Sequence, residues 1–123
     1  MTKERTSADL LITTIIGGIE DVKGKEITIL DLRDIENTVC DYFVVCEGTS
    51  NTQVNAIVNS IQKQVSKTTK DKPWHVEGVD NAEWVLLDYV NVVVHVFQKH
   101  IRDYYDIESL WGDAKTTQIE TSY

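Results

Sequence analysis

The stretch WVLLDYVNVVVHVF, residues 84–97, restricts what this chain can fold into more than any other feature. Apolar residues fill both alternating registers, and a polar notch between Asp88 and Asn91 is the main interruption. Such a run predicts two β-strands joined by a tight turn at the centre of a sheet that is covered on both faces. Because side chains alternate along a strand, Trp84, Leu86 and Asp88 are expected on one face, and Val85, Leu87 and Tyr89 on the other. An indole and a carboxylate then share that surface.

The turn inside this stretch has unusual chemistry. A two-residue hairpin turn needs positive φ angles, which Gly, Asn and Asp adopt readily, but here Val90 precedes Asn91. We therefore expect either that Val90 is strained or that the loop is longer than two residues.

Length and charge limit the class of protein. A chain of 123 residues is long enough for one compact domain with a core and too short for two ordinary ones. Its net charge of −8 has the wrong sign for a protein that neutralises many phosphates. The excess is concentrated in residues 77–113, which contain two basic residues, Lys99 and Arg102, and eight acidic ones: Glu77, Asp80, Glu83, Asp88, Asp103, Asp106, Glu108 and Asp113. Such a surface suits a basic protein partner, although an acidic excess also serves solubility alone.

The cysteines and the hydropathy indicate a soluble cytoplasmic protein. Cys40 and Cys46 lie in a predicted strand, roughly 20 Å apart at about 3.3 Å per residue, which is too far for a disulfide. Reduced thiols are typical of the cytosol. No apolar run has the length that crosses a bilayer.

The rest of the chain alternates helical and strand patterns. Helical spacing of apolar residues and β-branched runs predict, in order, a helix at 7–21, strands at 26–32 and 41–48, a helix from 51 to about 67, an edge strand near 73–79 and short helical turns within 102–114. Ser50 and Gln53 form a candidate capping box for the second helix. Gly17 and Gly18 indicate either close packing or fraying of the first helix. Residues 1–114 are expected to form one domain, and the aperiodic residues 115–123 a disordered tail.

The turn Gly48-Thr49-Ser50 is the main candidate for catalysis. A strand that passes through Gly into a helix presents free amides to an anion, and nucleotidyltransferases use a Gly-Ser at this point. They also need carboxylates two residues apart on a following strand to hold a divalent metal ion. None of the strands predicted after Ser50 carries such a pair, so we favour plain helix capping and keep a nucleotide-binding or nucleotidyltransferase-like enzyme as the alternative.

The histidines and cysteines do not predict a metal site. His75, His95, His100, Cys40 and Cys46 lack the paired spacings of zinc ligands. His95 alternates with valines, which favours a buried, hydrogen-bonded imidazole. We therefore expect no metal and no cofactor.

Aromatic residues lie among the acids. Trp84, Trp111, Tyr104 and Tyr105 beside carboxylates resemble the anchors and rim of a protein interface. The alternative is that these rings only fill the core. This alternative is weaker for Trp84, because Asp88 is expected on the same face of the strand.

Several blocks together resemble the ribosomal silencing factor family, also called the Iojap family. They cover most of the chain in the family's order: LDLR at 30–33, DYFVVCEGTS at 41–50 with Gln53-Val54 following, Glu77-Gly78, the 84–97 stretch and RDYYDIESLWGDA at 102–114. One departure is Val90-Asn91, where the family usually has Gly-Asp.

The resemblance implies a fold and a function. The fold would be α/β, a mixed β-sheet flanked by helices, nucleotidyltransferase-like without the catalytic carboxylates. The protein would not be an enzyme. It would bind the large ribosomal subunit through ribosomal protein fourteen and sterically block the small subunit, repressing translation under nutrient limitation, with no direct nucleic-acid recognition and no membrane.

By matching position, the resemblance implies a partner-binding surface of Trp84, Leu86 and Asp88, with Tyr89 and Asn91 at the adjoining turn. A homodimer through the same face is a further alternative.

Overall fold

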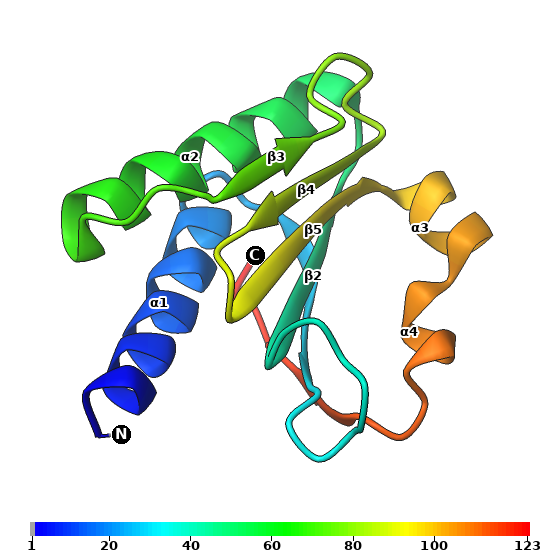
Figure 1. The fold of residues 1–123 in the computed structure, drawn as a ribbon. Helices are drawn as coiled ribbons and strands as arrows, with labels where there is room; N and C mark the ends of the chain where they lie inside the picture. Colours follow the sequence, from blue (N-terminus) through cyan, green and yellow to red (C-terminus); the bar gives the residue numbers. More distant parts are fainter. Residues whose placement is uncertain (1) are drawn as a thin grey trace.

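Residues 2–123 are described by a computed structural model, with side chains from Ala8 onward, and they are organised around one six-stranded sheet (Figure 1). The strand order is β3-β4-β5-β2-β1-β6. The elements in chain order are α1 (Thr2–Asp21), β1 (Lys25–Asp31), β2 (Tyr42–Gly48), α2 (Asn51–Thr69), β3 (His75–Glu77), β4 (Trp84–Asp88), β5 (Val92–Gln98), α3 (Lys99–Tyr105), α4 (Ile107–Leu110) and β6 (Lys115–Gln118). Within this part of the chain, no helix combines the length and apolar character that a membrane span requires.

The sheet is mixed, as the fold prediction requires. β2 and β5 run parallel, while the other neighbouring strands are antiparallel. The 84–97 stretch forms β4 and β5, with β5 beside β2 at the centre of the sheet, so its predicted position is confirmed. In β4 the side chains of Val85 and Leu87 are fully buried, whereas Trp84, Leu86 and Asp88 are half-buried, which confirms the predicted alternation.

Helices cover the two faces of the sheet unequally. α1 and α2 pack on one face, and α3, α4 and the loop between β1 and β2 lie on the other (Figure 1). The first face carries the larger cluster of aliphatic residues, including Ile15, Ile57 and Val94. The second carries a smaller cluster with more aromatic rings. The α1–α2 face is therefore the main core, and the other face is only partly closed.

Gly18 lets α1 and α2 approach closely. A Cβ atom at this position would lie 2.9 Å from the Ile61 Cα atom of α2, and the Ser60 hydroxyl donates to the Gly18 carbonyl at 2.6 Å. A Cβ on Gly17 would meet nothing within 4 Å. Close packing thus accounts for Gly18 and not for Gly17. The helix itself begins at Thr2 rather than at residue 7.

The expectation of a disordered tail is wrong for residues 115–118. They form β6, which pairs antiparallel with β1 at the edge of the sheet. The Tyr123 hydroxyl also donates to the Gly24 carbonyl. All four β6 residues are exposed, so the strand has no hydrophobic alternation, and main-chain hydrogen bonds hold it in place.

Arg102 fastens α3 and α4 to the sheet. The residue is 8% exposed. The five N–H groups of its guanidinium have five acceptors: Glu108 Oε1 at 2.9 Å, Glu108 Oε2 at 3.1 Å, Glu47 Oε1 at 3.1 Å, the Glu26 carbonyl at 2.7 Å and Thr28 Oγ1 at 3.2 Å. Burial works to lower the pKa of Arg102, but the hydrogen bond and charge of Glu108 outweigh it and raise that pKa. The cation stays charged between two carboxylates.

Both expectations for the turn at Val90 hold: the loop between β4 and β5 has three residues, 89–91, and Val90 is strained. Its φ is +75°, and the Asn91 amide donates to the Tyr89 carbonyl at 3.0 Å across it, as in a γ-turn. The Asp88 carboxylate accepts from the Val90 amide at 2.7 Å. A β-branched residue at positive φ is a steric outlier, so the surrounding hydrogen bonds hold the turn in a costly shape.

Removing the buried cation should destabilise the fold strongly. Arg102→Met leaves Glu47 and Glu108 without their partner, and breaking a buried ion pair in this way costs about 3 to 5 kcal/mol. Urea unfolding followed by circular dichroism measures the change. The matched control is Lys99→Met on the same helix, because the Lys99–Asp103 pair is exposed and such surface pairs contribute little to stability. Equal losses in the two variants would contradict the anchoring role of Arg102.

Relieving the strained turn should stabilise the fold. Val90→Gly removes strain of about 1 to 3 kcal/mol and adds a backbone entropy cost of about 0.5 to 1 kcal/mol. The free energy of unfolding should rise by about 1 kcal/mol, measured by the same urea titration. Val90→Ala keeps a Cβ atom at positive φ and should gain less than half as much. A glycine variant that is less stable than the parent would show that the turn is not strained.

Candidate partner-binding surface

A band of aromatic side chains crosses the sheet face beneath α3 and α4. Neighbouring rings in it lie 4.5–6.2 Å apart between centroids. We call this the aromatic band, and its members are Phe43, Trp84, His95, Phe97, Tyr105 and Trp111. Such edge-to-face and offset contacts fix ring positions more narrowly than aliphatic packing does. The face is therefore ordered even where it is incompletely covered.

Trp84 belongs to both the core and the surface. Its indole stacks on Phe97 at 4.8 Å and lies 5.0 Å from Tyr105 between ring centroids. Its N–H group donates to His95 Nδ1 at 3.1 Å. The residue is half-buried, so part of the ring still meets solvent. An interface anchor with this geometry is held in position before any partner arrives.

Leu86 and Asp88 continue the same row along β4, as their alternation predicts. The Asp88 main chain accepts from the Trp74 amide at 2.6 Å, which ties β4 to the segment before β3. Its carboxylate accepts from the Val90 amide and has capacity for further donors. An acid thus stands in a fixed position at the end of the row.

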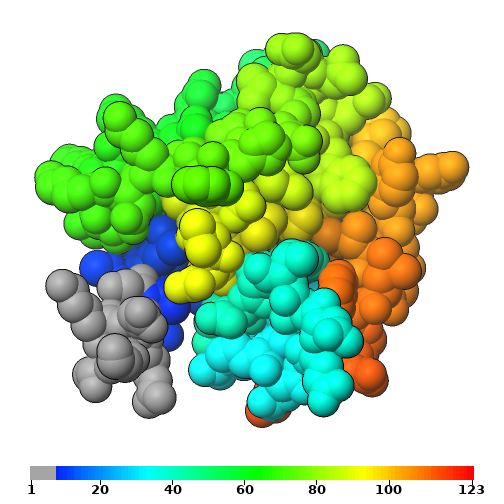
Figure 2. Space-filling view, in the orientation of Figure 1, coloured from blue at the N-terminus to red at the C-terminus, as the bar shows by residue number. Residues whose placement is uncertain are grey.

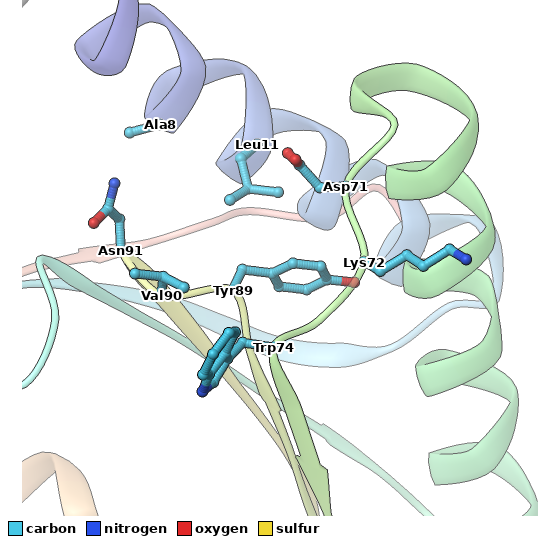
Figure 3. A pocket seen from close by; sticks show the side chains of 8 residues that line it. All are labelled: Ala8, Leu11, Asp71, Lys72, Trp74, Tyr89, Val90 and Asn91. Carbon is cyan, nitrogen blue, oxygen red and sulfur yellow. The ribbon is translucent and has the colours of Figure 1, made fainter.

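Tyr89, expected at the adjoining turn, lies on the opposite face of the sheet from Trp84, together with Val85 and Leu87, as alternation predicts. It is 7% exposed and packs in the cluster under α1 and α2. In Figure 3 its ring extends toward Asp71 and Lys72, while Asn91 points toward Ala8. Burial, with a smaller effect of Asp71, raises the pKa of Tyr89 to about 12. Asn91 is exposed at the turn.

The cations of the acidic segment are already paired. Arg102 is enclosed by Glu47 and Glu108, and Lys99 bonds Asp103 at 3.0 Å. Arg102 is buried and the exposed Lys99 already has an acidic partner, so neither offsets the remaining acids of residues 77–113. This part of the surface is therefore as acidic as the sequence indicates.

His95 is a buried, neutral imidazole, as its alternation with valines predicts. Because Nδ1 accepts from Trp84, the proton of the neutral ring sits on Nε2. Nε2 is buried and has no hydrogen-bond partner in the described part of the chain. Burial lowers the pKa of His95 to about 4. The ring is thus an acceptor that holds Trp84 and is not a catalytic base at neutral pH.

The Gly48–Ser50 turn is filled from within the chain. Ser50 Oγ accepts from the Gln53 amide at 3.1 Å, and Gln53 Oε1 accepts from the Thr49 amide at 2.7 Å. The predicted capping box is therefore present in a shifted form, with Thr49 rather than Ser50 as the second donor. Residues 8–123 contain no cluster of three potential metal ligands. Gln53 occupies the place at which an anion would meet the Thr49 amide.

Two exposed apolar residues near this surface were missed by sequence reasoning. Trp74 is 80% exposed and Val39 is 86% exposed. Both lie in loops without periodicity, where an apolar residue carries no sign of which way it faces. The one signal was an indole beside Pro73 in an otherwise polar connection.

Comparison with known proteins decides the family. A family model described as ribosomal silencing factor during starvation matches residues 4–122. The chain belongs to the ribosomal silencing factor family. The mixed α/β fold agrees with this: a crystal structure from Chromobacterium violaceum has a TM-score of 0.79 at 38% identity and covers 93% of each chain.

Relatives in the family include bacterial and mitochondrial proteins. The ribosomal silencing factor RsfS of Halalkalibacterium halodurans is 37% identical over 110 residues, 89% of this chain and 92% of that protein. A Mus musculus protein named mitochondrial assembly of ribosomal large subunit protein 1 is 33% identical over 73 residues, 58% of this chain and 32% of the mouse protein. The match to the silencing factors thus spans nearly the whole domain.

In this silencing-factor domain, His95 should make stability fall in mild acid. Its pKa is about 4 in the folded state against about 6.5 unfolded, so the unfolded chain binds the extra proton between these values. The contribution of His95 to the free energy of unfolding is fully present above pH 6.5 and is lost as the pH falls toward 4. The loss from His95 between pH 7 and 4.5 should be about 2 kcal/mol, measured by urea unfolding at both pH values.

Two variants isolate this contribution from that of the carboxyl groups. His95→Asn keeps an acceptor for Trp84 and cannot titrate, so its stability should change less between the two pH values. His100→Asn, at an exposed histidine, should retain the parent's pH dependence. The same pH dependence in the parent and His95→Asn would show that this imidazole does not control acid stability.

Proposed function

We propose that this chain is a ribosomal silencing factor that binds the large ribosomal subunit through ribosomal protein fourteen and sterically blocks the small subunit. It lowers translation under nutrient limitation and makes or breaks no covalent bond. Membership of the ribosomal silencing factor family carries the proposal. The mouse relative, whose name refers to the ribosomal large subunit, supports the choice of subunit.

The chemistry of the aromatic band's outer edge supports a protein partner. Half-exposed Trp84 and Leu86 offer an apolar anchor, and Asp88 and the exposed Asn91 offer polar contacts beside it. Interfaces combine such a centre with a polar rim. We infer that these four residues contact the partner, and that Tyr89 supports the turn from the opposite face.

Electrostatics favour a basic protein over bare nucleic acid. The net charge is −8, and the acidic segment surrounds the proposed surface. Such complementarity speeds encounter with a basic partner and repels phosphates. A passive obstruction needs only a stable complex in the right place, so no cofactor, metal ion or membrane is required. A homodimer through this face would compete with ribosome binding and would appear in light scattering as a doubled mass.

The decisive experiment measures subunit joining. Purified large and small subunits are mixed with increasing amounts of the protein, and the fraction of joined ribosomes is measured by sedimentation. We expect the fraction of joined ribosomes to decline as the protein saturates the large subunit. The reason is that the protein and the small subunit compete for one region of the large subunit. Undiminished joining at saturating occupancy would exclude the blocking mechanism even if binding is real.

Charge reversal at Asp88 tests the proposed surface. Asp88→Arg opposes a basic partner and removes the acceptor for the Val90 amide, whereas Asp88→Asn removes the charge and keeps an acceptor. We expect affinity for isolated large subunits to fall at least about thirtyfold for Arg, by the energy of an interface hot spot. The affinity of the Asp88→Asn variant should lie between those of the parent and of Asp88→Arg. Co-sedimentation measures all three affinities.

The control has the same charge change at the other edge of the sheet. Glu120 is exposed and follows β6. The Glu120→Arg variant should therefore bind large subunits nearly as the parent does. Trp84→Ala is a poorer test, because the indole also packs on Phe97 and bonds His95. Equal binding by the Asp88→Arg and Glu120→Arg variants would place the contact elsewhere.

A further inference from the structure

An open hollow lies beside the proposed surface and is lined by Val39, Trp74, Asp88 and Val90. Its volume is about 390 Å³. Three of the four residues are large apolar side chains that face solvent, with Trp74 80%, Val39 86% and Val90 59% exposed. Isolated exposed apolar residues are ordinary, but a group of them around one carboxylate indicates a binding site.

Three segments far apart in sequence build this hollow. Figure 2 shows them on one face of the molecule: the green segment after α2, the yellow turn between β4 and β5, and the cyan loop between β1 and β2. Main-chain hydrogen bonds join them, from Trp74 to the Asp88 carbonyl at 2.6 Å and from Asp41 to the Asn91 carbonyl at 2.9 Å. The walls are therefore held at fixed positions by backbone, although their side chains are exposed.

The lining combines three chemical elements. The Trp74 indole supplies an aromatic face, Val39 and Val90 supply aliphatic contacts, and Asp88 supplies a negative charge. In Figure 3 the Trp74 indole points away from α1, so it is not part of the main core. An arginine side chain matches all three elements, because its stem is aliphatic and its guanidinium stacks on indoles and pairs with carboxylates.

We propose that this hollow takes up one arginine side chain of the basic protein partner, with its guanidinium between the Trp74 ring and the Asp88 carboxylate. The inference rests on the proposed function and adds a second anchor to it. Asp88 belongs both to the row with Trp84 and to the hollow, so the two sites form one continuous surface. Trp74 then acts as an interface anchor in its own right.

The surrounding charges favour a cation. Asp41 lies in the adjoining loop, and both Asp41 and Asp88 act on the buried Cys40 thiol, whose pKa rises to about 11 mainly through burial. Arg33, which lies in the same loop as Val39, is held by Asp31 through two hydrogen bonds. Lys72 lines the neighbouring hollow of about 290 Å³ on the α1 side instead. A phosphate group would meet the Asp88 carboxylate here, which argues against RNA as the occupant.

Substitutions of Trp74 separate cation–π binding from plain apolar contact. Affinity for isolated large subunits is measured for the parent and for Trp74→Ala, Trp74→Phe and Trp74→Leu. A desolvated cation–π contact of about 2 kcal/mol corresponds to roughly thirtyfold in affinity. We expect losses of about ten- to thirtyfold for Ala and Leu and a smaller loss for Phe, which keeps an aromatic face.

Fluorescence gives a second readout. Trp74 is the most exposed of the three tryptophans, since Trp84 and Trp111 are half-buried. Quenching by acrylamide in the free protein should come mainly from Trp74, and saturation with large subunits should protect this component. Leu110→Ala, which removes another exposed apolar residue away from the hollow, is the matched control and should bind as the parent does.

Each outcome decides a different question. Absence of binding by the parent protein would reject the proposed function, whereas parent-like binding by Trp74→Ala would reject only the arginine site. Parent-like binding by Trp74→Leu would show that the hollow takes an apolar side chain and would overturn the proposal. Tight binding of the parent to protein-free large-subunit RNA, lost in Trp74→Ala, would show that a base rather than a cation stacks on the indole.

Discussion

The guanidinium of Arg102 is the contact on which the second face of the sheet depends. Its five donors meet acceptors from β1, β2 and α4, so a single side chain of α3 joins four elements. α3 and α4 are too short to be stable on their own, and Ile101 and Ile107 add apolar contacts with the sheet to those of Arg102. Because Arg102 fixes their position, Tyr105 and Trp111 can pack against Trp84 and Phe43. The aromatic band is therefore a consequence of an ion pair and not of hydrophobic collapse alone.

This arrangement separates stability from recognition. The face under α1 and α2 is closed by aliphatic residues and needs no partner, whereas the aromatic face is closed only partly and keeps Trp84 and Leu86 half-exposed. His95 accepts a hydrogen bond from the Trp84 indole, and the rigid neighbouring rings restrict this indole further. Trp84 therefore has little side-chain entropy left to lose on binding. A surface that is ordered in advance, with an acid beside it, suits a protein that acts by occupying space.

The sequence predicted those features that depend on local pattern. Alternation placed Trp84, Leu86 and Asp88 on one face, Ser50 and Gln53 marked the start of α2, and the chemistry of Val90 indicated either a strained turn or a loop of more than two residues. Features that depend on contacts between distant segments were not predicted. Glu47 and Arg102 are 55 residues apart, and nothing in either segment indicates the other. β6 has no alternation because all its residues are exposed, and its pairing with β1 depends on backbone alone. Tyr89 lies on the face that alternation predicts, but its burial there depends on the residues of α1 and α2 in the same cluster, which the strand pattern does not show.

The strained turn connects these observations. Strain at a β-branched residue persists only where the surroundings impose it, and such positions gather at functional sites. Here the Asp88 carboxylate caps the Val90 amide, and the same two side chains line the hollow beside Trp74. Glycine would satisfy the backbone more easily, as in the family's usual Gly-Asp pair, but it would remove one apolar wall. The valine has a physical explanation if the hollow binds the stem of a long side chain of the partner. In that case an exposed aliphatic group is kept at positive φ because its contact with the partner offsets the strain in the backbone.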